Sequence, residues 1–194
     1  MAVLTINIIL AILFSTVPLK KFCCNNYGFA PTAFGEVFIG CITDKSNIIC
    51  HLHFMQKDPI DYIQQLQNRW PFSTLSSNNS LAQLKAKYLF SSAGATADVN
   101  EVLGVNGTAF QLEVWNALLT IPVGQTCTYT ELAELLKKPK AVRAVANAVA
   151  SNEIAFLIPC HRVVSKCGNV SKYRWGGELK KQLIEFEKNP NKSV

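Results

Sequence analysis

The sequence has little charge and lacks the features that define several whole classes of protein. Only 16% of its 194 residues are charged, which argues against a disordered or strongly solvated chain. There is no internal repeat and no low-complexity tract, which excludes solenoid and fibrous architectures. Because 49% of the residues are hydrophobic, the chain can bury the core of one large domain or of two small ones.

A disulfide framework is also missing. The cysteines number seven, an odd count, and their irregular spacing does not match the evenly paired pattern of small secreted domains. We therefore expect a reducing compartment. The positive charge is modest, since 19 Lys and Arg against 13 Asp and Glu give a net charge of +6. This excess suits a polyanionic partner, but it becomes informative only together with a motif.

One apolar run stands near the N-terminus, at residues 3–17, VLTINIILAILFSTV. A membrane-spanning helix needs about 20 apolar residues, and this run is shorter and contains Asn7. A signal peptide carries positive charge ahead of its apolar stretch, whereas Lys20 and Lys21 follow this one. We expect no membrane partner and assign no role to residues 1–25. A packed extra segment, a misplaced start codon and an export role stay open.

The first half of the chain combines strand-like segments with two helices. Residues 34–42 and 47–54 are rich in β-branched and aromatic types on either side of four turn residues, which predicts a β-hairpin. Residues 58–70 have apolar side chains at helical spacing, and residues 81–90 predict a second short helix. The stretch between these helices, residues 73–80, is predicted to be an exposed turn.

A linker is predicted at residues 91–100, SSAGATADVN, because small and turn-forming residues dominate there. We place the domain boundary near residue 95. This divides the chain into an apolar extension of unknown role at 1–25, a first domain at 26–95 and a second domain at 96–194.

The second half has the pattern of successive helices. Residues 108–119 carry an apolar face behind Thr108, a plausible N-cap. A helix that Thr128 or Thr130 could cap runs to Leu136, and residues 141–150 form another after a four-residue basic turn. Two helices of about ten residues joined in this way are typical of a helix-turn-helix.

The second of these helices offers small side chains instead of the usual base-reading residues. Arg143 and Asn147 are its only long polar residues, and its alanines include Ala141, Ala144, Ala148 and Ala150. Two interpretations stay open. One is a core helix with an apolar face. The other is a helix that enters a narrow groove of DNA and uses Arg143 as a wedge in the base stack.

The residues with the clearest chemistry lie at 158–164, IPCHRVV. A thiol is weakly ionised near neutral pH, so Cys160 needs a base, and its neighbour His161 is the natural candidate. Adjacent side chains in an extended chain point in opposite directions. The pair therefore needs a kink or a bridging water, and Pro159 favours a path that is not a strand. An acidic residue of the last helix should orient the imidazole, and the candidates are Glu178, Glu185 and Glu187.

The string IPCHRVV resembles the active-site signature of the O6-alkylguanine-DNA alkyltransferases, the methylated-DNA–protein-cysteine S-methyltransferases. Residues 110–133, 138–152 and 173–187 match the same family in order and spacing. The resemblance is strong over about residues 100–188 and weaker over the predicted hairpin. It implies an α+β fold in which a small N-terminal α/β domain with an antiparallel sheet precedes a helical, winged-helix-like C-terminal domain with the helix-turn-helix.

The resemblance also implies roles for individual residues. Cys160 corresponds to the alkyl acceptor, His161 to a base that acts through water, and Glu187 to the acidic partner of that base. Asn152 corresponds to the residue that bridges the helix-turn-helix and the active-site loop. The residues that correspond to contacts with DNA or the damaged base are Tyr129, Ala141, Arg143, Ala144, Arg162, Val163, Tyr173, Arg174, Trp175 and Lys180.

The implied activity is repair of DNA by direct reversal. The base is flipped from the minor groove at a cost of a few kcal/mol, and Arg143 fills its place. Cys160 then takes the alkyl group from O6-alkylguanine, or from O4-alkylthymine, irreversibly and once per molecule. The implied partner is damaged double-stranded DNA bound by a monomer that can act cooperatively. We expect a cytoplasmic protein associated with the nucleoid.

No cofactor and no catalytic metal is required by this scheme. Some members of the family hold a structural zinc in the N-terminal domain, but Cys23-Cys24 lacks the paired short spacing of such sites. The other candidate ligands there are Cys41, Cys50, His51 and His53. Trp175 could narrow the pocket or act as a lid. The alternatives to transfer are a lesion-binding protein, which Cys160 argues against, and a hydrolase that uses Cys160, His161 and Glu187, for which no oxyanion-hole glycine motif is present.

Overall fold

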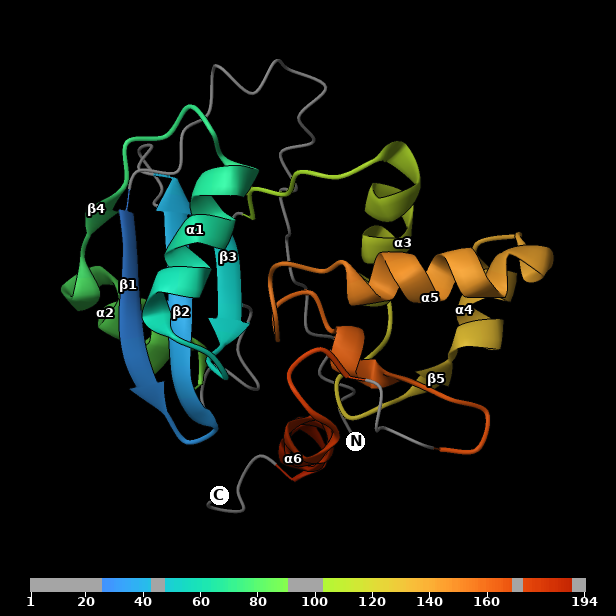
Figure 1. Cartoon of the computed structure of the whole chain (residues 1–194). Coiled ribbons are helices and arrows are strands. Elements are labelled where there is room, and N and C mark those ends of the chain that lie inside the picture. The colour runs from blue at the N-terminus through green and yellow to red at the C-terminus, as the bar shows by residue number, and fades with distance from the viewer. Residues whose placement is uncertain (1–25, 43–47, 91–102, 169–172, 190–194) are drawn as a thin grey trace. The chain divides into compact units, whose positions relative to one another are not determined.

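In the computed structural model, residues 26–42, 48–90, 103–168 and 173–189 are described (Figure 1). The described residues up to Asn106 form one unit, and those from Gly107 form a second. The N-terminal extension, the predicted linker at 91–100 and the predicted boundary near residue 95 lie outside the described residues. Among the described helices, none has the length and apolar character needed to cross a membrane.

The N-terminal unit is built on a mainly antiparallel sheet. Its strands are β1 (Asn26–Thr32), β2 (Gly35–Ile42), β3 (Ile48–Phe54) and the short β4 (Ser76–Ser77), in the order β3-β2-β1-β4. β2 and β3 form the predicted hairpin, with an irregularity of register between Gly40 and Cys41. β1 was not predicted, yet it pairs with β2 along its whole length.

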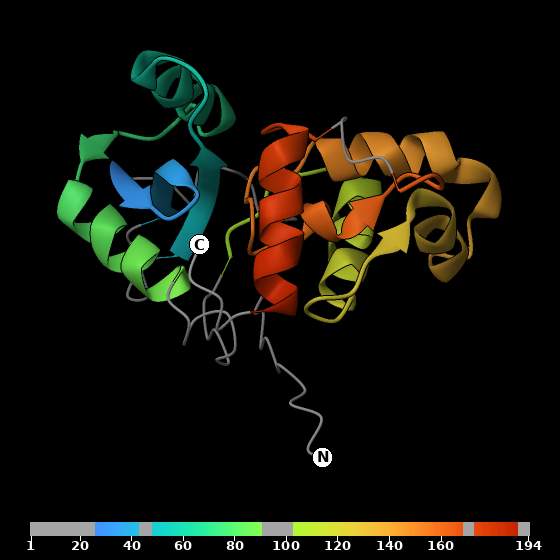
Figure 2. The ribbon, with the colours of Figure 1, turned by 90° about the horizontal axis from the view of Figure 1, so that it is seen from below.

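Two helices cover opposite faces of this sheet (Figures 1 and 2). α1 (Pro59–Arg69) begins after Asp58, whose side chain accepts a hydrogen bond from the amide of Ile60. α2 (Asn79–Leu89) begins after Asn78, which caps the amide of Leu81 in the same way. The prediction of an exposed turn at 73–80 was therefore partly wrong, because β4 and the first turn of α2 occupy its second half.

Covering both faces explains the burial of the central strand. Six successive residues of β2 are buried instead of alternating, as expected for a strand packed on both sides. Phe38 packs with Tyr62 and Leu66 of α1 in one cluster. On the other face α2 approaches β1 so closely that a Cβ added to Gly28 would lie 2.6 Å from the carbonyl oxygen of Asn78.

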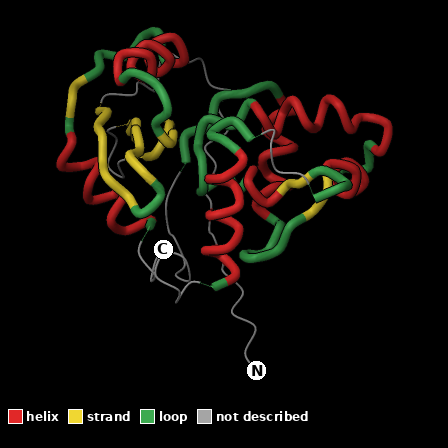
Figure 3. The backbone as a smooth tube through the Cα atoms, turned by 60° about the horizontal axis from the view of Figure 1, so that its bottom comes forward, coloured by secondary structure: helices red, strands yellow, loops and turns green. Residues whose placement is uncertain are grey.

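The C-terminal unit consists of short helices around one small parallel strand pair (Figure 3). α3 (Ala109–Leu119) starts at the predicted cap Thr108, which forms a capping box with Gln111. The remaining elements, in chain order, are β5 (Cys127–Thr128), α4 (Tyr129–Leu135), the 3-10 helix η2 (Pro139–Ala141), α5 (Val142–Ala150), the 3-10 helix η3 (Cys160–Arg162), β6 (Val163–Val164) and α6 (Gly177–Lys188).

The predicted pair of helices around a basic turn is present as α4 and α5. Thr128, not Thr130, is the cap of α4, and its capping box includes Glu131. The indole of Trp115 in α3 donates a hydrogen bond of 2.8 Å to the carbonyl of Ala148, which fastens α5 to α3. Ala148 itself is buried together with Val145 and Val149, so the helix has the apolar core face of the first interpretation.

The core of the N-terminal unit should depend on Leu66 far more than on Leu84. Leu66 is fully buried in α1, whereas Leu84 in α2 is 67% exposed. Leu66→Ala should lower the free energy of unfolding by about 2–5 kcal/mol, because it leaves a cavity. The matched substitution Leu84→Ala should change it by less than about 0.5 kcal/mol. Chemical denaturation measures both, and equal losses would contradict the packing described here.

Candidate active site

Cys160 begins a tight turn at the edge of the small strand pair. Its 3-10 helix, η3, follows Pro159 and leads directly into β6. β6 pairs with β5 in parallel, with Cys127 opposite Val163, and α4 starts at the next residue after β5, Tyr129. The pairing therefore sets Tyr129 beside Cys160, and both line one small cavity. The predicted path that is not a strand is confirmed for Cys160 and His161.

Asn152 holds the sulfur of Cys160 in place. Its side-chain nitrogen Nδ2 donates to Sγ at 3.1 Å and to the carbonyl of Ile158 at 2.9 Å. Its oxygen Oδ1 accepts from the amide of Ile154 at 2.9 Å. Asn152 follows α5 closely in the chain, so one buried amide joins the end of that helix to the turn that carries the thiol.

His161 is buried behind the sulfur and is oriented by Glu187 of α6. Its Nε2 lies 2.8 Å from Oε1 of Glu187, which selects this carboxylate from the three candidates of the last helix. The ring stacks on Phe156, with an interplanar angle of 10°. Phe156 has a φ of 65°, a left-handed conformation that is uncommon for a large residue and typical of functional loops.

Arg162 shares the carboxylate of Glu187 with His161. Its Nε lies 2.9 Å from Oε2, and its Nη2 lies 2.8 Å from Oε1, while Nη1 donates to the carbonyl of Ile121. The amide of Gly124 donates to Oε2 as well. Arg162 was expected to contact DNA or the damaged base. The residue is instead 5% exposed, and all three guanidinium nitrogens bond inside the protein.

These contacts determine the charge states of His161 and Glu187. Burial alone would raise the pKa of Glu187, but the hydrogen bonds and charges of His161 and Arg162 lower it to about 2. Burial lowers the pKa of His161 below its usual value, although Glu187 acts to raise it. Both directions fit a neutral imidazole beside an ionised carboxylate, since Arg162 supplies the permanent positive charge.

The thiol itself is protonated in this environment. Burial raises the pKa of Cys160, and the hydrogen bonds with Asn152 and Tyr173 and the charge of Lys180 lower it by less. The phenol oxygen of Tyr173 lies 4.0 Å from Sγ, and burial raises the pKa of Tyr173 well above its usual value. Tyr173 is therefore a hydroxyl that can donate a hydrogen bond. Reaction of Cys160 requires a group that takes its proton.

Lys180 is buried underneath Tyr173. Its Nζ donates to the carbonyl of Val163 and lies 5.5 Å from the centre of the Tyr173 ring. Burial lowers the pKa of Lys180, and a thiolate at Cys160 acts to raise it. Lys180 therefore supports the ring that faces the sulfur, and it gives the surroundings of the sulfur a positive charge.

The predicted site residues fall into three groups. Cys160, Tyr129, Tyr173, Arg174 and Trp175 line the cavity. Buried residues that are hydrogen-bonded to Cys160 or to one another form the second group, namely Asn152, His161, Glu187, Arg162, Val163 and Lys180. Ala141, Arg143 and Ala144 lie apart from the cavity, at the start of α5, where Arg143 and Ala144 are exposed.

Three further residues were not predicted to belong to the site. Val149 and Ala150 line the cavity from the end of α5, and Glu153 pairs with Arg174. The signal that could have found Val149 and Ala150 is their place in the chain just before Asn152. No pattern links Glu153 to a residue 21 positions away.

The comparisons with known proteins agree with this geometry. Residues 109–189 match the family model described as the DNA binding domain of 6-O-methylguanine DNA methyltransferase. The chain is 34% identical to the inducible methylated-DNA–protein-cysteine methyltransferase of Bacillus subtilis, over 87% of this chain and 88% of that protein. It is 39% identical to the bifunctional transcriptional activator and DNA repair enzyme Ada of Escherichia coli, over 75% of this chain but only 41% of Ada.

Solved structures show the same fold. The crystal structure of Mycobacterium tuberculosis OGT in complex with DNA superposes with a TM-score of 0.64 and 28% sequence identity. The match covers 84% of this chain and 93% of that one. The predicted α+β fold, with an N-terminal antiparallel sheet and a helical C-terminal part, is confirmed.

Ionisation of Glu187 should make the free energy of unfolding depend on pH in the acid range. Its pKa of about 2 in the folded chain lies below the ordinary 4.5, so its contribution is complete above pH 4.5 and is lost as the pH falls toward 2. Glu187→Gln should lower the free energy of unfolding near neutral pH by about 3–5 kcal/mol, because Arg162 loses its buried partner. The difference between the two proteins should shrink between pH 4.5 and 2.

The measurement is chemical denaturation of both proteins over this pH range. Glu185→Gln is the matched control, since Glu185 is an exposed residue of the same helix. It should have little effect at any of these pH values. A Glu187→Gln loss that stays the same from pH 7 to pH 2 would contradict the ionised carboxylate.

Proposed function

The chain belongs to the methylated-DNA–protein-cysteine methyltransferases, and we propose that it repairs DNA by transferring an alkyl group from O6 of guanine to its own Cys160. The observation that carries this proposal is the surroundings of the thiol. Cys160 is fastened by Asn152, faces a cavity lined by Tyr129 and Tyr173, and has His161 next to it in the chain. This arrangement supports a thiol held ready for one reaction.

In the proposed reaction, His161 takes the proton of Cys160. Its imidazole is neutral, and its Nε2 is already bonded to Glu187. Among the described residues Nδ1 has no hydrogen-bond partner, so Nδ1 is the nitrogen that can accept the proton, through a water as the resemblance implies. Glu187 then stabilises the imidazolium that forms, as an orienting carboxylate does in other nucleophilic sites.

The thiolate attacks the alkyl carbon in line with its bond to O6. The new bond joins sulfur and carbon, the carbon–oxygen bond breaks, and its electron pair stays with guanine. The hydroxyl of Tyr173 donates a hydrogen bond to the departing base, a role that its raised pKa supports. The product is a thioether, which neither water nor a second thiol removes easily. We therefore propose that each molecule reacts once and that the scheme needs no cofactor.

DNA is proposed to bind through α4 and α5. The open face of α5 carries Ala144 and Ala150 beside Arg143 and Asn147, all four exposed. Small side chains let the backbone of a helix approach closely, which suits the narrow minor groove. A base paired in a duplex is out of reach of a buried sulfur, so the target must be flipped. Arg143 is then the side chain long enough to fill the vacated place.

Other parts of the proposal rest on the same reasoning. O4-alkylthymine presents the same link between an alkyl carbon and a ring oxygen, so we propose it as a second substrate. Action as a monomer, cooperativity on DNA and a cytoplasmic location remain predictions.

Cys160 should be the residue that gains the alkyl group. After incubation with a duplex containing O6-methylguanine, mass spectrometry should find one added methyl group, on the peptide that contains Cys160. Cys160→Ala should abolish transfer and leave DNA binding nearly unchanged, whereas Cys167→Ala, at an exposed free cysteine, should leave transfer intact. Repair by the Cys160→Ala variant, or more than one product per molecule, would contradict the mechanism.

Arg143 should matter more for repair than for binding. Arg143→Ala should slow methyl transfer about tenfold or more, because the flipped state costs a few kcal/mol and loses its support. DNA affinity, measured by fluorescence anisotropy, should fall much less. Lys140→Ala is the control, since Lys140 is exposed just before α5. The loss of a phosphate contact there should reduce the transfer rate and the DNA affinity by the same factor. If Arg143→Ala reduced the transfer rate and the DNA affinity by the same factor, Arg143 would be only a phosphate contact.

A further inference from the structure

The cavity beside Cys160 is too small for the base that the proposed function brings to it. Its volume is about 20 Å³, which is on the scale of a single water. Pockets that hold ordinary small ligands measure roughly 300 Å³ or more. The walls of the cavity must therefore separate before a purine can reach the sulfur.

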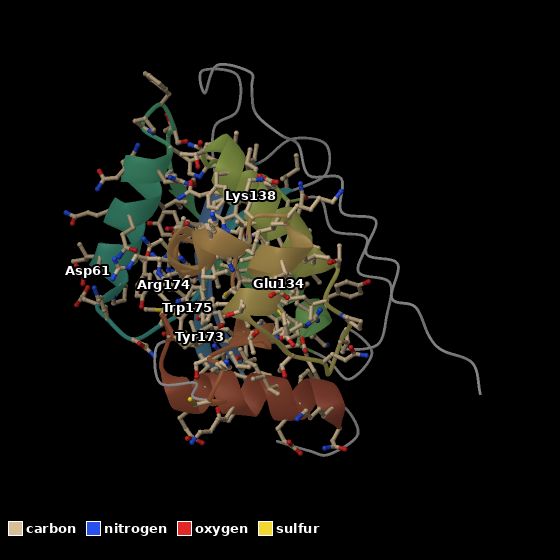
Figure 4. All side chains as sticks on the ribbon, turned by 90° about the vertical axis from the view of Figure 1, so that its right-hand side faces the viewer. Asp61, Glu134, Lys138, Tyr173, Arg174 and Trp175 are labelled. Carbon is tan, nitrogen blue, oxygen red and sulfur yellow. The ribbon has the colours of Figure 1, made fainter. Side chains whose placement is uncertain are left out.

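Two segments form facing walls of this cavity. One is the end of α5, which contributes Val149 and Ala150. The other is the segment of Tyr173, Arg174 and Trp175 that precedes α6 (Figure 4). Trp175 is only 3% exposed, and its ring meets that of Tyr173 edge to face at 5.3 Å. The second segment is thus a compact aromatic wall, and widening the cavity means displacing it.

Arg174 joins the two walls. Its Nη1 donates to the carbonyl oxygen of Asn152 at 3.0 Å and to Oε1 of Glu153 at 2.9 Å, and both acceptors follow α5 in the chain. Its guanidinium also lies over the ring of Trp175, 5.6 Å from the ring centre. A movement of Trp175 away from α5 would therefore disturb an ion pair, a hydrogen bond and a cation–π contact.

We propose that the ion pair between Arg174 and Glu153 is a latch that holds Trp175 over the cavity and so limits the size of the alkyl group that Cys160 accepts. This inference rests on the proposed function. Transfer of a methyl group requires a small displacement of the wall, whereas transfer of a benzyl group requires a large one. Contacts that resist displacement therefore slow the larger group more than the smaller one.

Substitution of Glu153 can distinguish a latch from a direct role of Arg174 in catalysis or DNA binding. It does not line the cavity and has no hydrogen bond to Cys160, His161 or Tyr173 among the bonds described. Removing its charge should therefore weaken the latch without removing a group that touches the reacting atoms. If Arg174 served only to bind DNA phosphate, losing Glu153 would change the rates for small and large alkyl groups by the same factor.

The experiment compares two duplexes of the same sequence, one with O6-methylguanine and one with O6-benzylguanine. Intact-protein mass spectrometry follows the gain of a methyl or a benzyl group on Cys160 over time, and the readout is the ratio of the benzyl rate to the methyl rate. Steps shared by the two duplexes cancel in this ratio. Glu153→Gln should raise it by roughly two- to fivefold, the scale of a partly exposed ion pair.

Further variants test whether the two residues act together. Arg174→Gln should raise the ratio at least as much, because it also removes the bond to Asn152 and the contact with Trp175. The double variant should raise it no further than Arg174→Gln alone, because that change already breaks the ion pair. Glu113→Gln is the control. It breaks the ion pair between Glu113 and Lys138 in the same unit, and it should leave the ratio unchanged.

The outcomes separate the latch from the activity itself. If the unsubstituted chain transfers methyl but Glu153→Gln leaves the ratio unchanged, the latch is overturned while the proposed function stands. The same holds if Glu113→Gln shifts the ratio as much as Glu153→Gln does. If the unsubstituted chain transfers no methyl group to Cys160, the proposed function fails, and the latch fails with it.

Discussion

The buried carboxylate of Glu187 is the constraint on which the C-terminal unit depends. It accepts hydrogen bonds from Arg162 and the amide of Gly124 and lies within hydrogen-bond distance of His161. It therefore joins α6 to two segments that are far from it in the chain, the turn of Cys160 and the loop of Gly124. A carboxylate so well buried is tolerable only when it is paired and fully bonded. Displacement of α6 would therefore leave the buried guanidinium of Arg162 without its carboxylate partner. The same contacts hold the turn that carries Cys160.

Burial also explains how a reactive residue can remain inert until it is needed. The thiol of Cys160 is protonated because it is out of water, and the imidazole of His161 is neutral for the same reason. An exposed thiolate would react with oxidants and with many electrophiles. In the proposed reaction the sulfur becomes a nucleophile only within a closed site, so that selectivity and protection from oxidation have one physical cause.

The sequence alone predicted most elements and the central chemistry, but not the directions of the side chains. The resemblance of IPCHRVV indicated the proposed nucleophile, and helical spacing predicted the helices to within a few residues. β1 escaped prediction because Gly28 and Pro31 interrupt its strand pattern. Arg162 was assigned to the DNA or substrate through the resemblance, which gives a position in the chain and says nothing of the direction of the side chain. Only tertiary packing turns its guanidinium inward.

The pairing of β5 with β6 spans only two residues on each strand, yet it sets the distance between the sulfur and α4, one of the two helices that are proposed to bind DNA. Its ladder is made by the main chain, so the side chains at Cys127 and Val163 can be exchanged without changing that distance. An inserted or deleted residue is different, because a slip of one position reverses the faces of a strand. Exchanges of side chains should therefore leave the strand pairing intact, whereas a change in the length of a segment that leads into it should not.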